Sequence, residues 1–270
     1  WCDWSSDVCS SDLLTPDSEQ LSDVKPEDVR SGDLGVTMVL NPWDEFAVEE
    51  ALLLQERFDG EAIVLTLGTE ESAEALKRAV AMGIEEPILL SDDLFQGSDA
   101  WATAHILAQA IRKIGDYSLI LAGKQSVDGN GGLVGPGIAV QLGIPFVSNV
   151  NKIVDLNEDE AVVLRNLDEG IQTVKVKLPA VVALSTEINE PRYPNFMGIR
   201  KASRMQYPAV GADEVPGLNR ARLGEAAALL TWSELRKPPA ATSKVEFIQG
   251  GSPAEQAAAL VDKLIADKAI

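Results

Sequence analysis

The stretch YSLILAGKQSVDGNGGLVGPGIAVQLG, residues 117–143, joins an apolar run to a glycine-rich loop and then to a helical pattern. LILAG predicts a buried strand, KQSVDGNGG a loop, and LVGPGIAVQLG a helix with Pro136 in its first turn. Glycines let the backbone approach a ligand closely, and a helix N-terminus attracts anions. The stretch favours a phosphate-binding turn, although a tight turn with a purely structural role fits the same residues. It is not a P-loop, because GxxxxGK[ST] is absent.

Strand-like and helix-like patterns alternate upstream of this stretch. Asn41 and Pro42 suit the N-cap and first position of a helix, and Ser98 with Asp99 suits the cap of another. Strands are predicted at 35–40, 62–68, 87–90 and 117–123. Strands alternating with helices of this length predict an α/β fold, a doubly wound, mostly parallel sheet with helices on both faces. In such sheets, ligands bind where the carboxyl ends of strands lead into helices.

Composition excludes several classes of function. The 270 residues carry a formal net charge of -19, which disfavours binding to nucleic-acid phosphates. No window approaches the roughly 20 apolar residues of a membrane span, and no signal peptide is evident at the start, so a cytoplasmic location is expected. The single histidine, His105, is expected at a semi-exposed helical position without a catalytic role. Neither catalytic residues nor a metal site are predicted.

The first 13 residues, WCDWSSDVCSSDL, differ from the rest of the chain. They contain both cysteines and show neither helical nor strand periodicity. The string DWSSDVCSSDL resembles the conceptual translation of a short-read sequencing adapter, so residues 1–13 are interpreted as a non-native segment rather than a native tail. Without them the chain has no cysteine, which removes disulfides and thiolate chemistry.

A second region, residues 161–204, carries a family signature. AVVLRNL and IQTVKVKL predict a hairpin around Asp168, Glu169 and Gly170. The region resembles the signature of the electron transfer flavoprotein (ETF) beta subunit, and the segments NPWDEFAVEEAL, RAVAMG, GKQSVDG and INEPRYPNFMGIRKA are similar to other segments of that family. The resemblance is dense over residues 14–205 and loose beyond them.

This resemblance implies a domain organisation. It implies an adenine-nucleotide alpha-hydrolase-like sheet plus a hairpin over 14–205, with a recognition loop at 188–202, and a C-terminal arm over 206–270 that embraces the alpha subunit. Ala257, Leu260, Val261 and Leu264 form an apolar stripe in that arm, which could instead pack on its own domain. Only the tail of the family's first strand segment is preserved, in LLTPDSEQ, so the central strand is expected to be missing and its neighbours to be unpaired.

The resemblance also implies a nucleotide site. In the family, AMP is a structural ligand of the beta subunit, and the redox FAD is held by the alpha subunit against the beta surface. A bifurcating branch binds a second FAD instead, but DGNGGLVGP here replaces its DGDTAQVGP, which favours AMP. Lys124 is expected to pair with phosphate or to be a solvated lysine, and Asp128 to accept from ribose or to cap the helix. The cofactor-binding residues carried over are Asn41, Pro42, Trp43, Asp44, Leu67, Gly68, Gly123, Lys124, Gln125, Ser126, Val127, Asp128, Gly131, Gly132, Leu133 and Val134.

The implied role is that of a bacterial electron carrier in fatty acid oxidation, without catalytic residues of its own. Its implied partners are the ETF alpha subunit, acyl-CoA or related dehydrogenases, and ETF:quinone oxidoreductase. Phe196 is expected to anchor the dehydrogenase, or else to pack on its own domain. Alternatives are a stand-alone adenine-nucleotide-binding protein and an ATP-using enzyme of the related fold, whose SGGxDS loop is absent. The partner-binding residues carried over are Ile188, Asn189, Glu190, Pro191, Arg192, Tyr193, Phe196 and Lys201.

Overall fold

A computed structural model describes residues 5–10, 13–17, 19–20, 24–25, 35–230 and 245–269, with only the backbone of residues 5–10. The chain forms two compact units, Trp1–Glu234 and Leu235–Ile270. The first unit continues beyond the boundary expected at residue 205, because strand β11 joins its sheet and Leu223 lies in its core.

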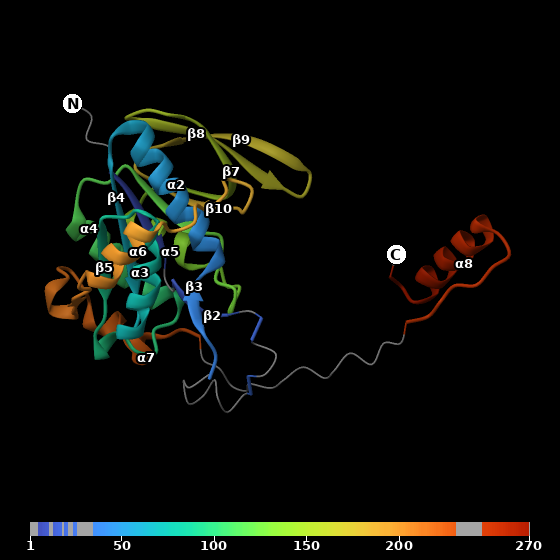
Figure 1. Cartoon of the computed structure of the whole chain (residues 1–270), viewed down its shortest axis with the longest axis horizontal. Helices are drawn as coiled ribbons and strands as arrows, with labels where there is room; N and C mark the ends of the chain where they lie inside the picture. Colours follow the sequence, from blue (N-terminus) through green and yellow to red (C-terminus); the bar gives the residue numbers. More distant parts are fainter. Residues whose placement is uncertain are drawn as a thin grey trace. The chain divides into compact units, whose positions relative to one another are not determined.

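The first unit is built on a nine-stranded sheet with the order β11-β5-β4-β1-β6-β10-β7-β8-β9 (Figure 1). The strands from β11 to β7 pair in parallel, and β8 and β9 extend the sheet in antiparallel fashion. The sheet is therefore mostly parallel, as predicted. The strands are β1 (Ser5–Ser10), β4 (Glu61–Leu67), β5 (Glu86–Leu90), β6 (Leu119–Gly123), β7 (Phe146–Leu156), β8 (Glu160–Leu167), β9 (Gly170–Lys177), β10 (Ala180–Leu184) and β11 (Ala209–Val210).

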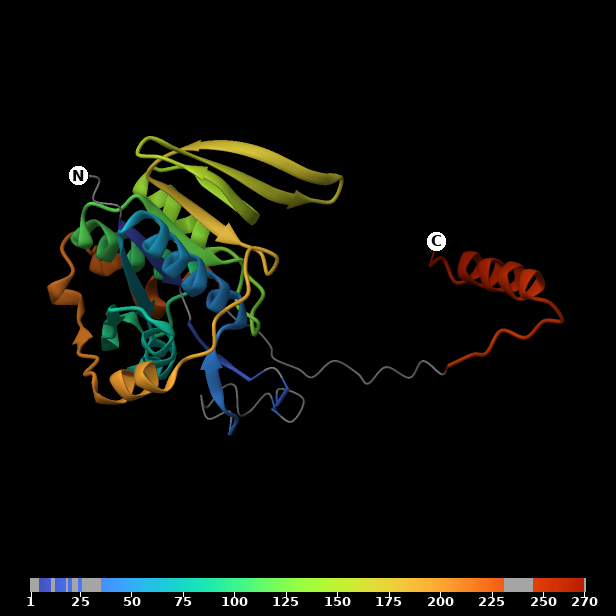
Figure 2. The same ribbon diagram turned by 45° about the horizontal axis from the view of Figure 1, so that its top comes forward.

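Helices cover both faces of this sheet (Figure 2). Successive strand residues point to opposite faces, so Val64 packs in the core with α2 and α3 residues, whereas Leu65 packs in a second core with α4 and α5 residues. Helix α6 lies against α3, and a Cβ on Gly198 would lie 2.2 Å from the Ala81 carbonyl oxygen. The helices of this unit are α2 (Pro42–Phe58), α3 (Ala73–Met82), α4 (Ala100–Ile114), α5 (Val134–Leu142), α6 (Phe196–Arg204) and α7 (Gly224–Ala227).

The strand predicted at 35–40 is shorter and lies outside the main sheet. Strand β3 (Met38–Leu40) pairs antiparallel with β2 (Leu14–Pro16) in a separate two-stranded ribbon. The amide of Asn41 also donates to the Leu13 carbonyl, at 2.6 Å, just before α2 begins. Because these backbone groups pair with residues 13–16, they are not available to the parallel sheet.

The expectation that the central strand is missing is wrong. Strand β1 occupies that place and pairs in parallel with both neighbours, with Val8 opposite Val64 and Leu121. Strand pairing uses backbone amides and carbonyls, which polar residues offer as well as apolar ones do. Residues 1–4 and 11–12 lie outside the described residues, and the non-native origin of residues 1–13 stays a prediction.

Two further expectations have different outcomes. The hairpin is confirmed, since Leu167 pairs with Gly170 across the Asp168–Glu169 turn. The semi-exposed position of His105 is wrong, because α4 is covered along most of its length and His105 is 3% exposed. Burial, followed by the charge of Arg222, lowers the pKa of His105, which favours its neutral form.

The second unit contains α8 (Pro253–Ala266), which begins at the N-cap Ser252. The Ser252 hydroxyl accepts a hydrogen bond from the Glu255 amide at 3.3 Å. None of the α8 side chains is buried, and Leu260, Val261 and Ile265 are each about half exposed. Over the described parts of both units, no helix is both long and apolar enough to cross a membrane.

Candidate nucleotide-binding site

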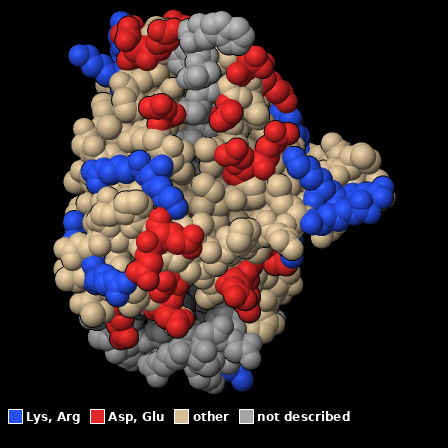
Figure 3. All heavy atoms as spheres, turned by 90° about the vertical axis from the view of Figure 1, so that its left-hand side faces the viewer, with Lys and Arg blue, Asp and Glu red and all other residues tan. Residues whose placement is uncertain are grey.

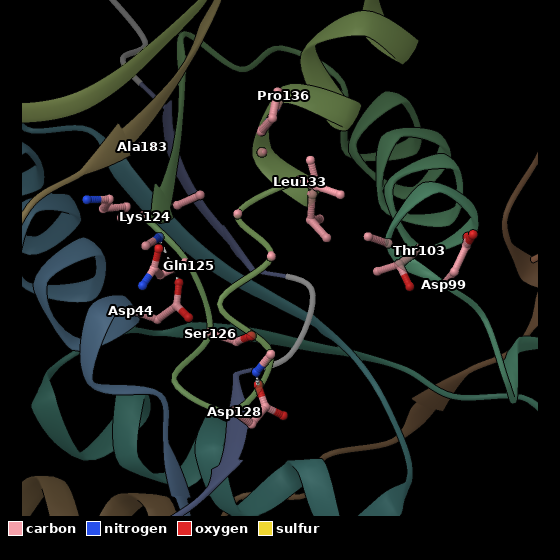
Figure 4. Close-up of a pocket in the computed structure, with 18 of the residues that line it drawn as sticks. Asp44, Asp99, Thr103, Lys124, Gln125, Ser126, Asp128, Leu133, Pro136 and Ala183 are labelled. Atoms are coloured by element: carbon pink, nitrogen blue, oxygen red, sulfur yellow. Dashed lines mark hydrogen bonds between the residues drawn. The ribbon is translucent and has the colours of Figure 1, made fainter. Parts of the chain in front are cut away.

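A cavity of about 710 Å³ lies at the carboxyl ends of β6 and β10 (Figure 4). One wall is the loop that leads from β6 into α5, and the opposite wall is the first turn of α4, which carries Asp99 and Thr103. Its volume is in the range of small-molecule sites. The cavity occupies the place where an open parallel sheet binds its ligands.

The structure brings most of the predicted nucleotide residues to this cavity. Those that line it are Asp44, Gly123, Lys124, Gln125, Ser126, Asp128, Gly131, Gly132, Leu133 and Val134. The other predicted residues do not line it in the described part of the chain, and these are Asn41, Pro42, Trp43, Leu67, Gly68 and Val127.

The second wall of the cavity does not follow from the sequence pattern. It consists of residues at the start of α4, with Leu230 from a distant part of the chain. Ala183 of β10 lies on the other side of the cavity, near Lys124 (Figure 4). The Ser98–Asp99 cap was a usable signal, because it follows a strand of the parallel sheet, but it indicated only a helix start. The lining residues missed are Gly97, Ser98, Asp99, Ala100, Thr103, Ala122, Gly129, Gly135, Pro136, Ala183 and Leu230.

The N-terminal turn of α2 holds the glycine-rich loop in place. Asn41 occupies the N-cap position but makes no side-chain cap bond. Its amide nitrogen donates instead to the Gln125 carbonyl at 3.0 Å and to Asp44 Oδ2 at 2.6 Å. Its amide oxygen accepts from the Val127 amide at 3.3 Å. Asn41 is 1% exposed, so it acts on the loop conformation from behind the cavity wall.

Gly123 sits where the loop meets α2 and has no room for a side chain. Its amide donates to Asp44 Oδ1 at 2.8 Å. A Cβ there would lie 2.7 Å from that same oxygen and 2.8 Å from the carbonyl carbon of Trp43. The close approach of loop and helix therefore requires glycine at this position.

The two helices that begin at the cavity differ in how their first amides are used. Asp99 caps α4, accepting from the Trp101 and Ala102 amides at 3.1 and 2.9 Å. Burial raises the pKa of Asp99, but amide donors, Ala102 first, outweigh it and hold that pKa below its ordinary value. The N-cap of α5 is Leu133, which has no side chain able to cap, and Val134 and Gly135 line the cavity. The N-terminus of α5 is therefore the one suited to an anion.

Lys124 and Asp128 have definite partners within the chain. The Lys124 ammonium lies 5.6 Å from the centroid of the Trp43 ring, a cation–π distance. Asp128 is exposed, and its Oδ1 accepts from the Gly129 amide at 2.6 Å. Because the N-cap of α5 is Leu133, the expectation that Asp128 caps this helix is wrong. No cluster of three or more His, Cys, Asp or Glu side chains within the described ranges is arranged to hold a metal ion.

The predicted partner loop lies away from this cavity and follows β10. Ile188 packs on the core, whereas Glu190 is exposed. Tyr193 and Phe196 are 91% and 76% exposed, so the alternative that Phe196 packs on its own domain is contradicted. Other side chains of the loop contact α2 or lie near it. These are Asn189 and Arg192, while Pro191 between them is half-buried and Lys201 of α6 pairs with Glu85 at 3.6 Å.

Comparison with known proteins agrees with this fold. The family model of the electron transfer flavoprotein domain matches residues 32–215. The electron transfer flavoprotein subunit beta of Thermoanaerobacterium thermosaccharolyticum is 38% identical over 182 residues, 67% of this chain and 69% of that protein. The caffeyl-CoA reductase-Etf complex subunit CarD of Acetobacterium woodii is 36% identical over 231 residues, 85% of this chain and 87% of that protein. Protein FixA of Bradyrhizobium diazoefficiens is 33% identical over 255 residues, 92% of this chain and 88% of that protein.

The protein is of the open α/β class, with a cavity at the carboxyl ends of its strands, where sheets of this class bind their ligands. Within that class, this chain belongs to the electron transfer flavoprotein family, as a beta subunit. Such subunits are electron carriers rather than classical enzymes, they act with flavin, and they pair with an alpha subunit.

Proposed function

We propose that the chain, paired with a flavin-bearing alpha subunit, carries electrons from acyl-CoA or related dehydrogenases to ETF:quinone oxidoreductase, with AMP as a structural ligand. The observation that carries the AMP proposal is the cavity at the start of α5. Val134 and Gly135 line it at a helix N-terminus that has no side-chain cap, and Gly131 and Gly132 line it without side chains. Phosphate binds well to the amides of such an N-terminus because the helix dipole and the N–H groups point the same way.

A single phosphate suits this site better than an extended dinucleotide. Leu133 is 54% exposed and lines the cavity where the bifurcating pattern has glutamine. Gly131 offers no side chain where that pattern has threonine. Hydrogen-bonding groups for a second FAD are thus fewer here. Lys124 contributes positive potential beside the loop while its ammonium stays over Trp43.

A titration tests this ligand choice. The heterodimer with its alpha subunit is partly unfolded to strip bound nucleotide, refolded with one equivalent of FAD, and titrated with AMP and then with FAD in a calorimeter. We expect AMP to bind once per heterodimer and FAD not to compete for that site. Saturable binding of FAD with no response to AMP would favour the bifurcating alternative, and no binding of either would reject the nucleotide site.

The second part of the proposal assigns dehydrogenase docking to the surface at the start of α6. We define the apolar docking patch as the exposed side chains Tyr193, Phe196, Met197 and Ile199. The basic residues Arg200, Lys201 and Arg204 lie on the same helix and are exposed. The chain has a formal net charge of -19. On the face shown in Figure 3, acidic side chains form several groups, and smaller basic clusters lie among them. Aromatic anchors with a charged rim are typical of protein interfaces.

Phe196→Ala tests the docking assignment. We expect the apparent affinity for a reducing acyl-CoA dehydrogenase to fall by about 2 kcal/mol, roughly 30-fold, because a desolvated aromatic anchor is lost. Flavin content and melting temperature stay unchanged, since Phe196 packs on little of its own domain. Val140→Ala, which removes another exposed apolar side chain from α5, is the control. Equal electron transfer by wild type and Phe196→Ala would reject the anchor.

A further inference from the structure

The loop between β10 and α6 is fastened to α2 by Arg192. The guanidinium Nε lies 2.8 Å from Glu49 Oε2, and Nη2 lies 2.9 Å from Glu49 Oε1. The backbone amide of Arg192 donates to the same carboxylate at 3.0 Å. Nη1 reaches Glu56 Oε1 at 2.7 Å, about two helical turns further along α2. Two-pronged pairing of this kind fixes orientation as well as distance.

A second contact fixes the same loop three residues earlier. The side-chain nitrogen of Asn189 donates to the Phe46 carbonyl and to Glu50 Oε2, both at 3.0 Å. Pro191 lies between the two contacts and restricts the backbone further. Glu49 and Glu50 are 4% and 8% exposed, so the fixed points lie in the body of the domain.

These contacts lead directly to the apolar docking patch. Tyr193 follows Arg192 in the chain, and Phe196 begins α6 just beyond it. Asn195 caps that helix, accepting from the Gly198 amide at 2.8 Å. Ala202 on its inner side is buried against α3. The patch is therefore held at its far end by α6 packing and at its near end by Arg192.

We propose that Arg192 is a positioning residue for docking: through Glu49 and Glu56 it holds the apolar docking patch in its binding orientation before a partner arrives. This inference rests on the proposed docking function of that patch. A loop that is already ordered does not lose conformational freedom on binding, so the clamp strengthens association without touching the partner. Its loss acts on the apparent affinity for the dehydrogenase and leaves electron transfer within the complex unaffected.

Arg192→Gln in the full heterodimer tests the proposal, assayed by reduction with the same dehydrogenase. We expect KM for the dehydrogenase to rise about tenfold, because a freed loop must be ordered again on docking, with kcat and flavin content unchanged. Hydrogen exchange of the 188–196 backbone rises in the free heterodimer. Arg192→Lys restores part of the affinity, since an ammonium can still meet one carboxylate. Arg78→Gln is the matched control, because Arg78 also pairs with a glutamate of α2, Glu45, at 3.3 Å.

A double-mutant cycle separates this inference from the docking assignment itself. In a Phe196→Ala background, Arg192→Gln should add little, because both changes act on the same contact. If Phe196→Ala alone has no effect, the docking assignment fails. If Phe196→Ala weakens docking while Arg192→Gln does not, only the positioning role fails. Glu49→Gln tests the clamp from α2 if Arg192→Gln does not fold, and loss of folding in both would overturn the proposal in favour of a structural role.

Discussion

Helix α2 holds two loops, and it does so with different chemistry at each. At its N-terminal end, Asn41 and Asp44 bind the backbone of the nucleotide loop, and both are 1% exposed. Further along, Glu49 and Glu56 bind the charged side chain of Arg192, which is 33% exposed. The nucleotide loop is thus fixed by buried contacts to backbone groups. The docking loop is fixed by charge pairs that are buried at Glu49 and near solvent at Glu56.

The two contacts should differ in how much they contribute to the stability of the fold. A buried amide that loses its partner costs the full desolvation of that group, whereas an exposed ion pair is screened and contributes little. We therefore expect changes at the first contact to lower the stability of the fold and the nucleotide content together. At the second contact, changes on the exposed Glu56 side should act mainly on docking, whereas changes at buried Glu49 should also lower stability.

Gly123→Ala should give the largest effect. The added methyl would lie 2.8 Å from the Trp43 carbonyl carbon, and backbone at that point cannot move without shifting α2. We expect the free energy of unfolding to fall by about 3 kcal/mol, with loss of the bound nucleotide. Gly131→Ala is the control from the same loop, since nothing lies within 4 Å of its Cβ position. Urea unfolding of both heterodimers measures the effect, and equal losses would contradict the close-packing account.

Asn41→Ala should follow in size. It leaves the Gln125 carbonyl and the Val127 amide without their partner. We expect a loss of about 2 kcal/mol in the free energy of unfolding, because buried polar groups are left unpaired. Urea unfolding with a parallel assay of nucleotide content checks it. A full nucleotide content with unchanged stability would show that the loop holds its conformation without α2.

Glu49→Gln and Glu56→Gln should separate the two sides of the Arg192 clamp. Glu49 is buried and accepts from the guanidinium and the backbone amide, so its loss should cost about 1 to 2 kcal/mol. Glu56 is 59% exposed and accepts one bond. Its loss should cost less than about 0.5 kcal/mol. Thermal unfolding compares the stability of the two variants. A larger loss in Glu56→Gln than in Glu49→Gln would contradict the view that Glu49 is the stronger partner of Arg192.

Glu50→Gln should give a small effect of the opposite sign, a gain in stability at pH 7 that depends on pH. Burial raises the pKa of Glu50 above the ordinary 4.5, and this outweighs the hydrogen bond from Asn189. The folded state then holds its proton more tightly, so the contribution of Glu50 to stability is fully present below pH 4.5 and falls as pH rises through the folded pKa.

Gln carries no charge and still accepts from Asn189, so at pH 7 the variant should be more stable by about 1 kcal/mol or less. The gain disappears as pH falls below 4.5. Melting temperatures of both proteins across this range measure it, and a variant that is less stable at pH 7 would contradict a raised pKa.

The pattern of the sequence was enough to predict the parallel sheet and its helices. Buried apolar strands such as 62–68 and capped helices such as the one after Asp99 are local signals, and each is confirmed. The central strand was missed because Ser5–Ser10 is polar in sequence, while pairing in a sheet depends on backbone groups. The burial of His105 was missed because α4 is covered on more sides than its pattern indicates.

About half of the cavity could be predicted, and the other half depends on the order of strands. The loop after β6 is continuous in sequence, so its residues could be named together. Ala183 reaches the cavity only because β10 inserts between β6 and β7. Leu230 reaches it because its amide binds Asp99 Oδ2 at 3.1 Å, a contact between residues far apart in the chain. Neither placement follows from local patterns.

The nucleotide content of the purified complex tests whether the cavity at the start of α5 holds AMP. The chain is co-expressed with its alpha subunit, and the heterodimer is denatured and its released nucleotides are separated and counted. We predict one AMP and one FAD per heterodimer. Gly123→Ala should lose the AMP and keep the FAD. Two FAD and no AMP, or one FAD with no second nucleotide, would contradict it.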